Sequence, residues 1–106
     1  MSPHTLDLPF MFDNVDKPDH VAGRPSADTA ALAEAMSESW LAFARRGDPN
    51  NSQVPPWAPY GLERRTEMLF DAPTRAVDDP FPQERAAFSD VPTQQLGGGL
   101  LVRMQL

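Results

Sequence analysis

The sequence contains no cysteine among its 106 residues, which excludes a disulfide framework and any chemistry that needs a thiolate. It also has no apolar run approaching the roughly 20 residues that span a bilayer, so we expect no membrane segment. The N-terminus lacks a basic stretch followed by an apolar one, and we therefore expect no secretory signal. Together these absences are typical of a cytoplasmic protein.

Basic residues are scarce as well. There are 9 lysines and arginines against 15 aspartates and glutamates, which gives a formal net charge of −6. Nucleic-acid binding usually needs a clustered basic surface, whereas the pairs Arg45-Arg46 and Arg64-Arg65 are isolated. We therefore expect no nucleic-acid partner, and the acidic balance favours solubility.

Proline, by contrast, is abundant, with 12 residues in a chain long enough for one small domain. Because proline fixes φ and lacks an N–H donor, long regular elements are confined to the intervals between prolines. The widest interval lies between Pro25 and Pro49 and predicts a helix over residues 26–46. Ser26 or Asp28 can cap its N-terminus, and Gly47 can end it in the left-handed conformation.

One stripe of this helix is apolar, at spacings of 4, 4 and 3 residues: Leu32, Met36, Trp40 and Phe43. We interpret the stripe as a packing surface. The alternative is that the helix docks in a groove of a partner protein.

The other segments are short. Leu6, Leu8, Phe10 and Phe12 alternate, which predicts an extended segment with one buried face, although Pro9 argues against a central strand. Residues 47–65 are predicted to be loop, in which Trp57 and Tyr60 pack against prolines. Residues 66–70 predict one short strand and residues 83–88 a short helix. The tail has a flexible hinge at Gly97-Gly98-Gly99 and an apolar end over 100–106.

This inventory is mostly helix and loop with one short strand, and a single strand leaves its backbone hydrogen-bonding groups unpaired. The helix stripe also needs a surface to cover. The chain is therefore predicted to form the outer part of a larger body whose central sheet lies elsewhere.

Residues 2–12 carry the most specific motif. His4 is followed three residues later by the acidic Asp7, then by Leu8, Pro9 and the aromatic Phe10. This segment resembles the catalytic-histidine segment of bacterial type-B carboxylesterases, including the para-nitrobenzyl esterase group. Further resemblances follow in order along the chain, up to about residue 89: Met36, Trp40, Phe43-Ala44-Arg45, Gly47-Asp48-Pro49-Asn50, Trp57, Pro59, Tyr60, Met68-Leu69-Phe70, Asp79-Pro80 and Glu84-Arg85.

The resemblance implies that residues 1–90 are the C-terminal part of an α/β-hydrolase domain and that residues 91–106 are a divergent tail. It implies a serine esterase that acts on carboxylic esters through a Ser-His-Glu triad, with His4 as the catalytic general base. It implies no cofactor and no metal.

The resemblance also indicates what the chain lacks. No serine stands in the Gly-x-Ser-x-Gly context of the nucleophile, and the oxyanion hole and the triad glutamate lie upstream in the family. We therefore expect no specific esterase activity from the chain alone, and expect its partner to be the missing N-terminal portion. The alternative is a small stand-alone remnant that is not catalytic and that binds a protein or self-associates.

Two other readings concern acidic residues near the N-terminus. Asp7 could be a triad acid, but we favour a structural role in which it accepts backbone hydrogen bonds. Five residues could form a cation site, although their spacing does not fit an EF-hand and a solvated turn is the simpler interpretation: Asp13, Asn14, Asp16, Asp19 and His20.

Overall fold

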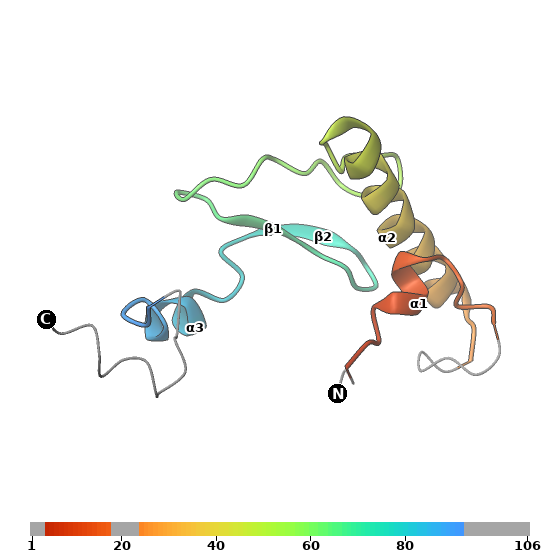
Figure 1. Cartoon of the computed structure of the whole chain (residues 1–106), viewed down its shortest axis with the longest axis horizontal. Coiled ribbons are helices and arrows are strands. Elements are labelled where there is room, and N and C mark those ends of the chain that lie inside the picture. The colour runs from red at the N-terminus through yellow and green to blue at the C-terminus, as the bar shows by residue number, and fades with distance from the viewer. Residues whose placement is uncertain (1–3, 18–23, 93–106) are drawn as a thin grey trace, which may run out of the picture.

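The structure, a computed structural model, describes residues 4–17 and 24–92. Five elements follow one another: α1 (Leu8–Met11), α2 (Ala27–Arg46), β1 (Thr66–Leu69), β2 (Arg75–Asp78) and α3 (Pro82–Ala87). Figure 1 shows α1 lying against α2, the two strands beside these helices, and α3 at the far end of the molecule from α2. The described part is thus mostly helix and loop, as the sequence predicted.

Local signals in the sequence account for both ends of α2. The Ser26 hydroxyl accepts a hydrogen bond from the Thr29 N–H at 3.2 Å, and the Ser26 N–H donates to the Thr29 hydroxyl at 2.7 Å. This reciprocal pair satisfies two backbone groups that a helix end leaves free. At the other end Gly47 has φ of 72° and its N–H donates to the Phe43 carbonyl at 2.7 Å. The predicted helix is confirmed, with Ser26 as its cap.

The prediction of an extended segment at Leu6 to Phe12 is wrong, because the structure forms the short helix α1 there. Phe10 of α1 is buried in the core against α2, and Leu6, in the turn before α1, packs against that core, whereas Leu8 and Phe12 are 44% and 71% exposed. Pro9 is compatible with this helix because it lies in the first turn, where its missing N–H costs no helical hydrogen bond.

The core is small. Phe10, Val15 and Ala33 form it, with Leu6, Leu32 and Met36 packed partly buried around them. No large side chain among the described residues is fully buried. The Cα radius of gyration is 18.2 Å, whereas a compact domain of 100 residues has about 13 Å. The chain by itself therefore lacks the compactness of an independent globular domain.

The predicted strand at residues 66–70 is present as β1, and it pairs with a second strand, β2, that the sequence did not predict. The two strands are antiparallel, with Thr66 opposite Asp78 and Leu69 opposite Arg75. The β2 sequence, Arg-Ala-Val-Asp, has one β-branched residue between charged ends and so carries little strand propensity. Pairing with β1 decides its conformation. In the described ranges the sheet has these two strands only, and no central sheet is present.

The short helix predicted at residues 83–88 is confirmed as α3, and none of its residues is buried. Arg85 joins it to the end of the hairpin through two hydrogen bonds to the Asp79 carboxylate, at 2.9 and 2.7 Å. The neighbouring Asp78 accepts hydrogen bonds from the Thr66 hydroxyl at 2.6 Å and from Arg64 at 3.0 Å. Polar side chains rather than apolar packing therefore connect α3 to the hairpin.

These contacts change the acidity of both carboxyl groups. The hydrogen bond from Arg85 holds the pKa of Asp79 below its ordinary value, and the hydrogen bonds from Thr66 and Arg64 lower the pKa of Asp78 in the same way. The Asp78 carboxylate is exposed and that of Asp79 is partly exposed, so solvent screens the ion pairs that they form.

The predicted hinge at Gly97-Gly98-Gly99 and the apolar end at 100–106 lie outside the described residues. The division of the chain at residue 90 therefore stays a prediction. Within the described ranges, no helix has the length and apolar character needed to cross a membrane.

We expect the attachment of α3 to depend on pH. Because folding lowers the pKa of Asp79, the Arg85 pair contributes stability above the ordinary aspartate value of 3.8. That contribution disappears as the pH falls through the lower value of the folded state. Arg85→Gln should therefore reduce the protection of α3 amides from hydrogen exchange at neutral pH, and the difference from the wild type should vanish in acid. Arg45→Gln, which removes an exposed arginine in α2, is the control; equal losses in both variants would contradict the assignment.

Candidate functional site

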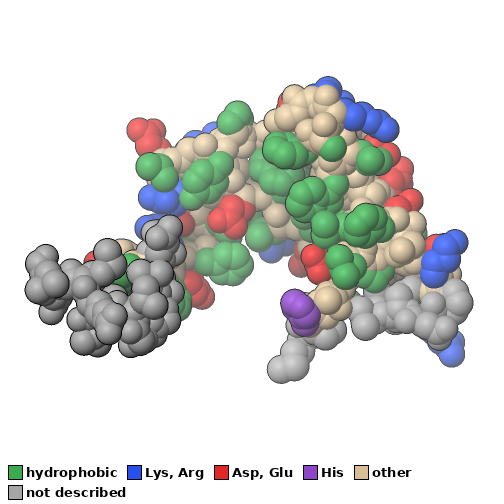
Figure 2. All heavy atoms as spheres, in the orientation of Figure 1, with side chains coloured by type: hydrophobic (Ala, Val, Ile, Leu, Met, Phe, Trp, Pro, Cys, Tyr) green, Lys and Arg blue, Asp and Glu red, His purple; other side chains and the backbone are tan. Residues whose placement is uncertain are grey.

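The predicted catalytic histidine lies at the start of the described chain, immediately before a turn that leads into α1. His4 is exposed, and the side chain of this described histidine is purple in Figure 2. The Leu8 N–H donates to the Thr5 carbonyl at 3.2 Å and closes the turn. His4 forms no hydrogen bond or ion pair with the other described residues.

Asp7 contributes to the turn through its backbone. Its carbonyl accepts hydrogen bonds from the N–H groups of Phe10 at 3.1 Å and Met11 at 2.9 Å, and its side chain makes no capping bond to α1. The structural role predicted for the Asp7 acid, accepting backbone hydrogen bonds, is therefore not seen in the described residues, where the accepting atom is the main-chain carbonyl. Within the described residues no ion pair joins Asp7 to His4, so the structure does not assemble a triad acid there.

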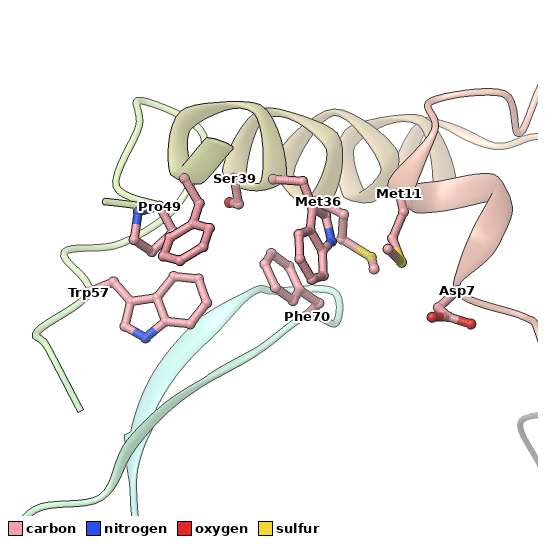
Figure 3. Close-up of a pocket in the computed structure, with 9 residues that line it drawn as sticks. Asp7, Met11, Met36, Ser39, Pro49, Trp57 and Phe70 are labelled. Atoms are coloured by element: carbon pink, nitrogen blue, oxygen red, sulfur yellow. The ribbon is translucent and has the colours of Figure 1, made fainter. Parts of the chain in front are cut away.

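A hydrophobic groove of about 480 Å³ opens beside this turn. Asp7 and Met11 lie at one end, α2 forms one side, and the loop and hairpin form the other, as Figure 3 shows. Its lining is Asp7, Met11, Met36, Ser39, Trp40, Phe43, Pro49, Trp57 and Phe70. Figure 2 shows the hydrophobic side chains gathered over α2 and the adjoining segments.

The apolar stripe of α2 has two different halves. Leu32 and Met36 are partly buried, because α1 packs over them. Trp40 and Phe43 are each 53% exposed, although they line the groove. The prediction that the stripe is a packing surface thus holds for the half that α1 covers, and the other half has no cover within the described residues.

The far wall of the groove is aromatic. Trp57 and Phe70 meet edge to face, with ring centroids 6.1 Å apart and an angle of 75° between the planes. This geometry is favourable because the positive ring edge meets the negative ring face. Trp57 thus packs as predicted, with Phe70 as its aromatic partner, while its packing against prolines stays a prediction. Tyr60 is 59% exposed and accepts a long hydrogen bond of 3.4 Å from Arg65.

Asn50 holds this wall in place. Its side-chain oxygen accepts a hydrogen bond from the backbone N–H of Trp57 at 2.7 Å, and its side-chain nitrogen donates one to the backbone carbonyl of Trp57 at 2.8 Å. Asp48 accepts from both the backbone and side-chain N–H groups of Asn50, at 2.9 and 2.7 Å. These bonds lower the pKa of Asp48. The loop after α2 is thereby folded back so that Trp57 faces the helix.

The possible cation site does not form among the described residues. Asp16 is paired with Lys17 at 3.3 Å, and no group of three or more histidine, aspartate or glutamate side chains converges in this part of the chain. Asp19 and His20 lie outside the described residues. A solvated turn remains the simpler account of Asp13, Asn14 and Asp16.

The described part has an exposed histidine ahead of a helix, an uncovered apolar groove and a hairpin without a central sheet, and the solved structures that it resembles are α/β-hydrolase esterases, of which it is a fragment. A profile of the carboxylesterase family matches residues 1–89. This chain belongs to the carboxylesterase family, as the resemblance in the sequence had indicated.

Similar proteins support this assignment. Para-nitrobenzyl esterase of Bacillus subtilis (strain 168) is 30% identical over 83 residues, covering 77% of this chain and 17% of its own length. Phenmedipham hydrolase of Pseudarthrobacter oxydans is 32% identical over 83 residues, covering 73% of this chain and 13% of its own. The crystal structure of a Geobacillus stearothermophilus carboxylesterase matches with a TM-score of 0.72 and 40% identity, over 82% of this chain and 20% of that chain.

The chain thus spans less than a fifth of the length of the curated relatives that it matches. Sequence reasoning proposed His4 as the candidate base and predicted packing for Trp57, but it assigned no role of their own to Asn50 and Thr5. The role of Asn50 could have been found, because asparagine in a turn often hydrogen-bonds nearby backbone groups. Thr5, which has φ of 68°, carried no such signal, since β-branched residues rarely adopt that conformation.

We expect Asn50→Ala to detach the aromatic wall. The substitution removes the side chain that bonds the backbone N–H and carbonyl of Trp57, which should lower the free energy of unfolding by about 1–3 kcal/mol. In a Trp40→Phe background, Trp57 is the remaining indole, and its fluorescence should shift toward longer wavelength as water reaches the ring. Asn14→Ala is the matched control, because that asparagine is exposed and its side chain makes no hydrogen bond to the described residues. An unchanged spectrum in Asn50→Ala would contradict the inference that Asn50 holds Trp57 in place.

Proposed function

We propose that this chain is the C-terminal portion of a serine carboxylic-ester hydrolase and that His4 supplies the catalytic general base. The observation that carries the proposal is the match to the carboxylesterase family over residues 1–89, which begins at the His4 segment. The exposure of His4 further supports it, because a base supplied to a nucleophile on another part of the protein must be free to reach it.

In this proposal the imidazole acts twice. It accepts the proton of the serine hydroxyl as the serine oxygen attacks the ester carbonyl, and it returns that proton to the departing alcohol. It then accepts a proton from the water that attacks the acyl-serine, and the serine oxygen recovers a proton as the carboxylic acid leaves. Imidazole suits both directions of transfer because it changes charge near neutral pH.

The serines of this chain do not offer a nucleophile. Ser37 and Ser39 are buried in α2 and donate to the carbonyls of Glu34 at 3.2 Å and Ala35 at 2.8 Å. Ser26 caps α2, and Ser89 donates to the Ala86 carbonyl at 2.8 Å. None of the six serines stands in a Gly-x-Ser-x-Gly context, including Ser2 and the exposed Ser52. The proposed enzyme therefore requires an N-terminal portion that carries the nucleophile, the oxyanion hole and the triad acid.

We expect the chain alone to show no saturable hydrolysis of a para-nitrophenyl ester. Joined to the N-terminal portion, it should support turnover that His4→Ala reduces by about 10³-fold or more, because the members of a triad act as a unit. The measurement is kcat from initial rates.

Two outcomes would count against the proposal: saturable turnover by the chain alone that His4→Ala abolishes, or full activity of the complete enzyme with His4→Ala. Slow hydrolysis that does not saturate is not evidence of catalysis, since free imidazole attacks activated esters.

The alternative function is a stand-alone chain that binds a protein or associates with itself. It is supported by the half-exposed Trp40 and Phe43 in the groove, since exposed apolar patches mark interaction sites. The mass of the native protein separates the two proposals. An antibody against residues 28–46 should detect a band several times heavier than 11.7 kDa if the chain is the tail of an esterase. A band near 11.7 kDa would favour the stand-alone protein.

A further inference from the structure

The most strained backbone position near the proposed catalytic base is Thr5, the residue that directly follows His4. Its φ is 68°, in the left-handed region. Three other non-glycine residues of the described chain have positive φ: Asp13, Arg65 and Asp79. Thr5 alone among the four is β-branched, and a β-branched side chain is the least tolerated there because its second Cβ substituent crowds the backbone.

The surroundings of Thr5 hold it in this conformation. Its carbonyl accepts a hydrogen bond from the Leu8 N–H at 3.2 Å, and the next hydrogen bonds run from Phe10 and Met11 to the Asp7 carbonyl. Phe10 is 8% exposed and packs in the core with Ala33 of α2. The turn is therefore continuous with a helix that is anchored on the longest element of the chain. Strained residues persist where their surroundings determine them this strongly, and they cluster at active sites.

The hydroxyl of Thr5 is not part of this arrangement, because it makes no hydrogen bond to the described residues and the side chain is exposed. What Thr5 contributes is the direction of its backbone. If Thr5 instead had φ near −65°, its N–Cα bond would be rotated by about 130° from its present angle. His4 precedes that bond, so the rotation would carry its imidazole away from its present position.

We propose that Thr5 is a positioning residue, whose left-handed backbone directs His4 toward the nucleophile of the complete enzyme. This inference rests on the proposed function of His4. It assigns to residue 5 a role in the orientation of the base and none in contact with the substrate.

The decisive variant is Thr5→Pro in the complete enzyme, since proline fixes φ near −65° and forbids the left-handed conformation. We expect kcat to fall by about 100-fold, the loss typical of a displaced catalytic group, with KM changed by less than about threefold. Thr5→Gly and Thr5→Val are the companion variants. Glycine adopts positive φ readily, and valine keeps the shape of threonine without the hydroxyl, so both should retain kcat within about fivefold of the wild type.

A second comparison separates positioning from a general structural effect. If Thr5 acts through His4, then Thr5→Pro should cause no further loss in an enzyme that already carries His4→Ala. A general folding defect would instead lower that residual activity again. A strong intraresidue Hα–HN nuclear Overhauser effect at Thr5 of the complete wild-type enzyme would report positive φ, whether or not the proline variant folds.

Four results would overturn the inference: a Thr5→Pro enzyme within about twofold of the wild type, additive losses with His4→Ala, losses in Thr5→Gly or Thr5→Val as large as in Thr5→Pro, or negative φ at Thr5 by NMR. If the proposed function of His4 were wrong, the result would differ, because His4→Ala would leave the complete enzyme active with any residue at position 5.

Discussion

The contact between Phe10 of α1 and Ala33 of α2 is the interaction on which the described structure depends. Ala33 is fully buried, and its small side chain lets the two helices approach closely. Without that contact α1 would be an isolated four-residue helix, which is far too short to be stable in water. Because the turn from His4 to Asp7 leads directly into α1, the position of the proposed catalytic base is set by the same packing.

In the rest of the described structure, polar groups find partners whereas part of the apolar surface stays uncovered. Polar groups find partners within the chain, in the capping pair at Ser26, the Asn50–Trp57 hydrogen bonds and the Arg85–Asp79 pair. Apolar side chains in the groove stay partly exposed to solvent. Hydrogen bonds between near neighbours form within a short chain, whereas burial of a large apolar face needs a second layer of structure. Within the described residues no second layer covers the groove, and the chain spans less than a fifth of the length of its curated relatives.

The elements that the sequence predicted are those with local causes. The ends of α2 follow from Ser26 and Gly47, whose side-chain oxygen and backbone freedom act within one turn of the helix. The elements that it predicted wrongly or missed have non-local causes. The alternating residues from Leu6 fit a strand, but contact with α2 selects the helix, and β2 exists because β1 lies beside it. Propensity is a weak guide where tertiary contacts decide.

By itself the sequence determined the family, the identity of His4 as the candidate base, the principal helix and the absence of a serine nucleophile in this chain. These are properties of residue identity and of order along the chain. Only the tertiary structure decided that α2 keeps an uncovered half, that Asn50 turns Trp57 toward it, and that Thr5 is left-handed. The physical reason is that side-chain exposure, a hydrogen bond across a loop and a strained φ all depend on how separate segments fold against one another, which the order of residues does not specify.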